Sequence, residues 1–427
     1  MTQQLTGPSG IEIAERRSLW RSRNFLLLWS GQTVSELGTR ISSIAVPLLA
    51  ANDLDASVFQ ISLLTSLAWL PYLLFSLPAG ILADRVDQRK LMIICDLGRM
   101  ALMVSLPLVA LVWELTLWFL YVVVGLSGVL TVLFTVAYKS TLPRLVEPHQ
   151  LVDGNAKLVM SQDFAELVGP TVSGLLIGLV GATRTFVSNG FAFLVSAVTL
   201  WLIREAPAER GTPPADGERV PLRVEMTDGL AFIRSQPILV KILACTTTSN
   251  FFVMASGSIE VTFMLRELHA SPLMVGLVFS VSAIGGLAVG AVANRLSNSI
   301  GTARVIWVAM VAPGPLYLLM PLAQPGWGVL LYGVGLAAFS GNVVLYNVAS
   351  MSYRQRITPP DLLGRVNASF LWICYGVIPL GALFGGALGS QLGLRAALWI
   401  FVLGTWSAAL FVVFSPLRTM RDMPAVP

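Results

Sequence analysis

Two stretches of this chain repeat one pattern. Residues 144–174 read RLVEPHQLVDGNAKLVMSQDFAELVGPTVSG, and residues 356–386 read RITPPDLLGRVNASFLWICYGVIPLGALFGG. Seven identities keep an offset of 212 residues: Arg144 and Arg356, Pro148 and Pro360, Leu151 and Leu363, Asn155 and Asn367, Ala156 and Ala368, Gly169 and Gly381, Gly174 and Gly386. Because chance identities would not keep one offset, we expect two parallel copies of one unit, an arrangement typical of transporters.

The composition indicates that lipid surrounds most of the chain. Of 427 residues 55% are hydrophobic and 12% are charged, with a mean hydropathy of +0.75. Soluble domains carry about 25% charged residues. Twelve apolar segments are long enough to cross a bilayer: Asn24–Ala50, Ile61–Ala83, Leu91–Trp113, Leu117–Ala137, Leu158–Gly181, Phe186–Ile203, Ile238–Phe263, Leu273–Ala293, Val305–Ala323, Trp327–Met351, Ala368–Leu392 and Ala396–Phe414.

These segments are continuous apolar runs without the alternation of a barrel strand, so helices are favoured. The sequence predicts an all-α membrane protein with twelve transmembrane helices in two parallel six-helix repeats. The expected divisions are a tail (1–23), a six-helix bundle (24–203), a linker (204–236), a second bundle (237–415) and a tail (416–427). In the linker, Leu222, Met226, Leu230 and Ile233 recur at helical spacing. That amphipathic helix could lie on the membrane surface or pack on protein.

Basic residues predict the orientation. Assigned to the loops, 23 Lys and Arg residues fall on the side of both termini and three on the other side. The positive-inside rule therefore predicts cytoplasmic termini. The net charge of +5 follows from this asymmetry and calls for no nucleic-acid partner.

Three short motifs resemble a known transporter family. The stretch Gly80-Ile-Leu-Ala-Asp84-Arg85-Val-Asp87-Gln-Arg89-Lys90 resembles the loop after the second helix of the major facilitator superfamily. Gly169-Pro170 resembles the Gly-Pro signature in helix 5 of its antiporters. The run STLPRLV (140–146), followed by Asn155-Ala156, resembles a bacterial subgroup that includes enterobactin exporters and macrolide efflux proteins, and this resemblance implies a bacterial inner membrane. The chain departs from the family at Asp87, where Gly is usual, and lacks the usual Arg in helix 4.

The resemblance implies a conformational gate. Asp84 is expected to latch the two halves, while the basic residues beside it either join that latch or only fix the topology. Asp96 and Arg99 in the third helix are expected to form a network of opposite charges. The expected gate residues are Gly80, Asp84, Arg85, Arg89, Lys90, Asp96, Arg99, Arg144, Gly169, Pro170 and Arg356.

Charges inside the apolar segments are candidates for function. Gln32, Glu36 and Arg40 share one helix face, and Glu36 lies roughly 18 Å into the membrane at 1.5 Å per residue. Arg40 is the expected partner of Glu36, either as part of a binding site or as a self-neutralising pair. Glu260 is expected to be wetted near the outer end of its helix. The expected substrate and proton pathway comprises Gln32, Glu36, Arg40, Thr131, Thr135, Glu166, Asn250, Asn342 and Tyr346.

These features predict a secondary transporter that exports a hydrophobic or amphipathic small molecule, such as a drug, antibiotic, siderophore or secondary metabolite, by alternating access. A proton is the expected coupling ion, and the protein is expected to be monomeric. Uptake, or a sensor without transport, is the alternative. No Lys follows a Gly, so no phosphate-binding loop is present. Both His residues lie in loops, and no metal, cofactor or enzymatic motif is found.

Overall fold

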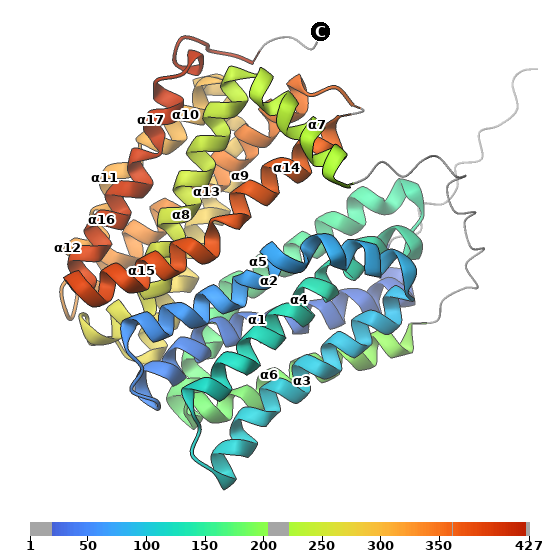
Figure 1. Cartoon of the computed structure of the whole chain (residues 1–427), viewed down its shortest axis with the longest axis vertical. Helices are drawn as coiled ribbons and strands as arrows, with labels where there is room; N and C mark the ends of the chain where they lie inside the picture. The colour runs from blue at the N-terminus through green and yellow to red at the C-terminus, as the bar shows by residue number, and fades with distance from the viewer. Residues whose placement is uncertain (1–18, 204–221, 361, 424–427) are drawn as a thin grey trace, which may run out of the picture.

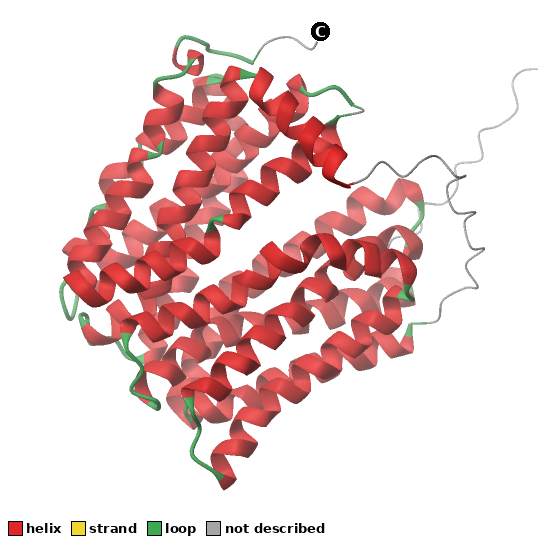
Figure 2. Ribbon diagram, viewed as in Figure 1, coloured by secondary structure: helices red, strands yellow, loops and turns green. Residues whose placement is uncertain are grey.

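The computed structural model describes residues 19–203, 222–360 and 362–423, in which helices and no strands are found (Figure 2). The tails and residues 204–221 of the expected linker lie outside the described residues. The helices of four or more residues are α1 (Arg23–Asn52), α2 (Val58–Arg85), α3 (Gln88–Val112), α4 (Leu117–Leu145), α5 (Leu151–Val180), α6 (Ala182–Leu202), α7 (Leu222–Ser235), α8 (Pro237–Arg266), α9 (Pro272–Ile300), α10 (Arg304–Val311), α11 (Gly314–Tyr317), α12 (Leu319–Leu322), α13 (Gly328–Ile357), α14 (Leu363–Gly376), α15 (Ile378–Leu392), α16 (Leu394–Ser407) and α17 (Ala409–Val413).

Eleven segments of the described chain are long and apolar enough to span a membrane. They are α2 to α6, α8, α9 and α13, together with the consecutive sets α10–α12, α14–α15 and α16–α17. α1 has 30 residues but is not among them, since polar residues such as Gln32, Glu36 and Arg40 lower its hydropathy. With α1 the described chain forms the twelve membrane-length segments of the predicted all-α fold.

Three expected continuous helices are interrupted: Ala396–Phe414 divides at Ala408 between α16 and α17, and two others divide at prolines. The segment predicted at Val305–Ala323 divides into α10, α11 and α12, with Pro313 directly before α11. The segment predicted at Ala368–Leu392 divides at Val377, two residues before Pro379. A proline inside a helix removes a backbone hydrogen-bond donor and collides with the preceding turn, which accounts for the interruptions near Pro313 and Pro379.

The helices form two bundles, α1–α6 and α8–α17 (Figure 1). Each bundle has its own hydrophobic core at the end of the molecule where α7 lies. One core contains Phe25, Met92 and Leu200 of the first bundle, and the other contains Ile242, Ile306 and Val366 of the second. We call this the α7 end.

The described part of α7 packs on protein, in agreement with one of the two interpretations left open by the sequence. Ile233 is buried in the core of the second bundle. Arg365 of α14 donates a 2.9 Å hydrogen bond to the Asp228 carboxylate. Gly229 lies so close to the Arg365 backbone that a methyl group there would collide with it.

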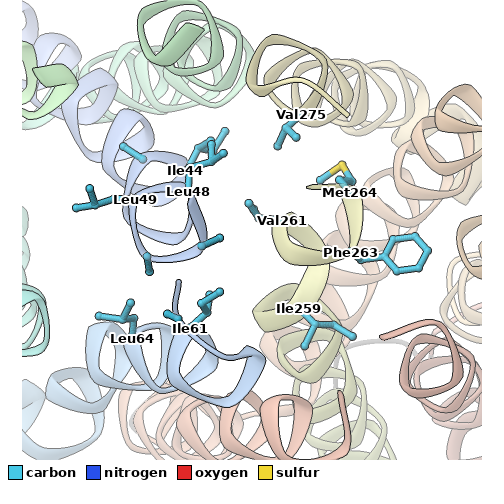
Figure 3. Close-up of a cluster of buried hydrophobic side chains, with 14 of the residues drawn as sticks. Ile44, Leu48, Leu49, Ile61, Leu64, Ile259, Val261, Phe263, Met264 and Val275 are labelled. Atoms are coloured by element: carbon cyan, nitrogen blue, oxygen red, sulfur yellow. The ribbon is translucent and has the colours of Figure 1, made fainter. Parts of the chain in front are cut away.

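At the opposite end, the two bundles share one core. It joins Ile44 and Leu48 of α1, Ile61 of α2, Ile259 and Val261 of α8, among other residues (Figure 3). Because apolar clusters cross between the bundles at this end and are separate at the α7 end, the bundles are joined at the end away from α7.

Small residues let the bundles approach closely there. A Cβ on Gly276 of α9 would lie 2.2 Å from the Pro170 carbonyl oxygen of α5, and one on Gly174 would lie 2.3 Å from the Pro272 carbonyl oxygen. Beside this seam, the Thr171 and Ser280 hydroxyls are 2.7 Å apart. Close approach of small residues is the usual basis of helix association in membranes.

Candidate functional site

Glu36 lies in the first bundle near the middle of α1 and is partly buried. The Gln32 amide donates a 2.8 Å hydrogen bond to Glu36 Oε1, as their spacing on one helix face allows. Tyr72 on α2 and Tyr138 on α4 lie near its carboxylate, within range of its charge. Within the described residues, no Lys or Arg nitrogen lies within 4 Å of Glu36, so its charge has no direct ionic partner.

The prediction that Glu36 forms an ion pair with Arg40 is wrong. Arg40 Nη2 instead lies 3.3 Å from Glu166 Oε2 of α5. Asp163, one turn before Glu166, interacts electrostatically with both members of that pair. Asp163 and Glu166 on α5 thus lie near Arg40, and Glu36 lies one turn from Arg40 on α1. This region of the first bundle holds three carboxylates and one guanidinium, an excess of two negative charges when all are ionised.

Gly169 brings this cluster together. A Cβ at position 169 would lie only 2.6 Å from Arg40 Cβ, so glycine permits the close contact of α1 with α5. Its neighbour Pro170 presents its carbonyl to Gly276 of α9 in the seam described above. The Gly-Pro pair thus sits between the charged cluster and the contact of the two bundles, in the packing role expected for such residues.

Thr131 and Thr135 both lie on α4, one turn apart, and are partly buried. Thr131 Oγ1 donates to the Ser127 carbonyl at 2.8 Å, and Thr135 Oγ1 donates to the Thr131 carbonyl at 2.7 Å. The Tyr72 hydroxyl also interacts with Thr135. Tyr72 therefore lies near both Thr135 and Glu36, which places the two threonines beside the surroundings of Glu36.

The three pathway candidates of the second bundle make their contacts within that bundle. Asn250 Nδ2 donates to the Cys374 carbonyl at 3.1 Å, near the interruption between α14 and α15. The Tyr346 hydroxyl lies 2.9 Å from Thr246 Oγ1 and donates to the Ile242 carbonyl. Asn342 is buried and interacts with Tyr317. The structure does not bring these side chains together with Glu36.

Asp96 and Arg99 form a buried ion pair inside the first bundle. Their side chains are 0% and 3% exposed. The guanidinium lies 4.4 Å from the ring centroids of both Phe134 and Phe193, on α4 and α6. The expected charge pairing is present. The residues that contact it belong to the first bundle, so these contacts stabilise the packing of α3 on α4 and α6.

The other gate candidates whose side chains are described, Arg89, Lys90 and Arg356, lie in different surroundings. Arg89 donates to the carbonyls of Leu200 and Trp201 at the end of α6, where exposed carbonyls favour a cation. Lys90 pairs with Asp87 at 3.7 Å on the surface, and Arg356 is exposed. α2 includes Gly80, Asp84 and Arg85, and α4 includes Arg144. The side chains of these four residues lie outside the described structure.

Sequence reasoning missed Arg354 and misplaced Glu260. Arg354 is one of the 23 basic residues from which the orientation is predicted, and it is buried with its guanidinium 4.2 Å from the Phe370 centroid. Its position two turns after Tyr346 on the buried face of α13 was the available signal. Glu260, expected to be wetted, is 8% exposed. No cluster of metal-ligating side chains is found in the part of the chain that the structure describes.

Comparisons with known proteins agree with this architecture. The family model of the Major Facilitator Superfamily matches residues 28–378. The chain is 26% identical to an uncharacterised transporter, YfiS, of Bacillus subtilis (89% of this chain, 90% of the relative). It is 23% identical to macrolide efflux protein A of Streptococcus pyogenes (96% and 99%) and 25% identical to the enterobactin exporter EntS of Citrobacter koseri (94% and 94%).

A solved structure shows the same fold. A bacterial homologue of the human lysosomal transporter Spinster, in an inward-facing and unoccupied conformation, matches with a TM-score of 0.75 and 18% identity, over 92% of this chain and 96% of that one. The family model covers most of the chain, and the described helices have the family's architecture. The chain therefore belongs to the Major Facilitator Superfamily, as a multi-pass membrane transporter of small molecules, in the neighbourhood of the macrolide and enterobactin exporters.

Proposed function

We propose that this transporter exports a hydrophobic or amphipathic small molecule in exchange for protons. The names of the macrolide and enterobactin relatives support export. Their identities of 23% and 25% leave the substrate itself open to experiment. Family membership places the chain among transporters rather than enzymes.

The observation that carries the proposal is the environment of Glu36. A carboxylate deep in a membrane helix is costly unless it is paired or protonated. Glu36 has an amide donor at 2.8 Å and no basic group within 4 Å among the described residues. Such a carboxyl can take up a proton without first breaking an ion pair. In our proposal, proton binding at Glu36 and substrate binding nearby alternate.

The neighbouring Arg40–Glu166 pair supplies a second element of the mechanism. It joins α1 to α5 on a partly exposed face. When Glu36, Asp163 and Glu166 are all ionised, their charges exceed that of Arg40 by two, which favours a neutral or positively charged substrate over an anion. We propose that release of this substrate accompanies protonation of the cluster.

The charge asymmetry of the sequence supports an orientation with the α7 end in the cytoplasm. The bundles share a core only at the other end, so this conformation would be open toward the cytoplasm. In alternating access, an exporter loads its substrate in that state. A reporter fused after α17 tests the orientation: cytoplasmic activity is expected, and periplasmic activity would overturn it.

Replacing Glu36 by Gln tests the proposed role. Gln keeps the size and hydrogen-bonding capacity but cannot exchange a proton. The test uses an efflux-deficient host exposed in turn to macrolides, siderophores and lipophilic dyes. The wild-type protein is expected to lower the accumulation of at least one of these compounds in the cells, and a protonophore should remove that effect. Glu36→Gln should reach the membrane at the wild-type level and show no efflux.

The matched control is Glu114→Gln, which changes an exposed carboxylate between α3 and α4. It should retain full efflux. If Glu36→Gln also exported normally, Glu36 would not couple transport. Higher accumulation with the wild type than with an empty vector would indicate uptake instead. No transport of any tested compound in proteoliposomes would favour a sensor.

A further inference from the structure

A second acidic residue lies far from Glu36, inside the second bundle. Glu260 is on α8, two turns before the helix ends at Arg266, and is 8% exposed. Among the described residues, it accepts one hydrogen bond, from Ser256 Oγ one turn earlier, at 3.3 Å from Oε1. A single long hydrogen bond from a neutral hydroxyl does not offset the loss of hydration of an ionised carboxylate.

A small cavity adjoins this carboxyl group. Three other oxygen-bearing side chains line it: Ser256 on α8, Tyr317 on α11 and Thr405 on α16. Apolar side chains, including Met320 and Phe339, complete the wall. The cavity has a volume of about 20 Å³, which is enough for about one water molecule or a small ion.

The positive charges near the ends of these helices are engaged elsewhere. Arg395 binds the Pro321 and Ala323 carbonyls, each at 2.6 Å, and lies 3.7 Å from Glu267. Arg266 donates to the Ala56 carbonyl at 2.8 Å. Within the described residues, no basic side chain lies within 4 Å of Glu260.

The remaining titratable neighbours are tyrosines. Tyr317 on α11 lines the cavity, and Tyr332 on α13 interacts electrostatically with Glu260 while its ring stacks on Phe263 of α8. From α16, Thr405 and the apolar Val402 face the cavity. Neutral hydroxyls can orient around a charge but cannot cancel it, so the Glu260 charge has to be neutralised by something else.

We propose that Glu260 is a binding site for a small monovalent cation, either a proton on the carboxyl group or Na⁺ in the adjoining cavity. Both neutralise the buried charge, and oxygen ligands from a carboxylate and hydroxyls suit a hard cation. The site is separate from the Glu36 cluster and lies inside one bundle. Cation binding there requires no substrate, so it can be tested whether or not the chain exports.

The test is the thermal unfolding of the purified full-length protein in detergent, measured in two titrations. One lowers the pH from about 8 to about 6 without Na⁺, and the other adds Na⁺ at about pH 8, with choline chloride holding the ionic strength constant. Because a ligand of the folded state raises the melting temperature, the wild type should be stabilised by a few degrees in one titration. A response to Na⁺ would identify the sodium ion, and a response to pH alone the proton.

Glu260→Gln should lose that response and keep a high melting temperature, because the neutral amide replaces the neutralised carboxyl. Glu114→Gln, at the exposed carboxylate between α3 and α4, is the matched control and should retain it. Equal responses of the wild type and Glu260→Gln in both titrations would overturn the proposal. If Glu260→Gln does not fold, Ser256→Ala serves instead, because it removes the hydroxyl that donates to Glu260. In the titration to which the wild type responds, this variant should shift the midpoint by about tenfold in cation concentration. An unchanged midpoint would count against the site. These melting temperatures do not depend on transport, so a failure to detect efflux would not change the result of this test.

Discussion

Individual charged residues in this chain have environments that sequence position alone did not reveal. The prediction identified Glu36 and Arg40 as neighbours on one helix face, but Arg40 pairs with Glu166, which lies 126 residues further along the chain. That partner is set by the close packing of α1 on α5 at Gly169. Likewise, the distance of Glu260 from a helix end did not indicate its burial, because burial depends on neighbouring helices.

The pair of Asp96 and Arg99 gives a prediction at this scale. Asp96→Asn would leave the Arg99 guanidinium buried between Phe134 and Phe193 without a counter-ion. Breaking a buried ion pair on one side typically costs about 3–5 kcal/mol. We expect a large fall in the melting temperature of the purified protein.

The control for that substitution is Asp87→Asn. Asp87 pairs with Lys90 on the surface and caps α3, and Asn can also serve as a cap. Exposed pairs contribute less than about 1 kcal/mol, so the melting temperature should change little. Similar losses in both variants would mean that the Asp96–Arg99 pair has no special structural role.

At the scale of elements, the repeat and the apolar runs predicted the helices well. What they did not predict were the interruptions near Pro313 and Pro379 and the docking of α7 on α14. An apolar run containing proline can be kinked, broken or continuous, and neighbouring helices decide which. The Gly-Pro motif at 169–170 was correctly associated with packing, whereas its partner Gly276 carried no sequence signal of its own.

The seam between α5 and α9 gives a prediction about conformation. Gly276→Leu would force a side chain into the Pro170 backbone, where a Cβ alone would lie 2.2 Å from the carbonyl oxygen. We expect this to weaken the joined end and to increase the labelling of a cysteine placed at Ser280, in a background lacking the three native cysteines. Gly257→Leu is the control, since a Cβ at Gly257 meets no atom within 4 Å. Equal labelling in both variants would contradict the role of the seam.

At the scale of the whole molecule, the sequence predicted the family and the all-α fold, and both are confirmed. The conformation could not be predicted, because the apolar pattern of the helices does not depend on which end of the two bundles is joined. The three hydrophobic clusters distinguish them: one crosses between the bundles, and two do not. Transport measurements test the proposed orientation, coupling and substrate together.

The most direct test uses inside-out membrane vesicles with an acidified interior. Each compound of the panel is added to the solution outside the vesicles. The account predicts that at least one amphipathic compound accumulates inside wild-type vesicles, that protons leave as it enters, and that collapsing the pH gradient abolishes accumulation. Vesicles with Glu36→Gln should accumulate none. Accumulation that is insensitive to the gradient, or that is unchanged in Glu36→Gln, would contradict proton-coupled export through the Glu36 site.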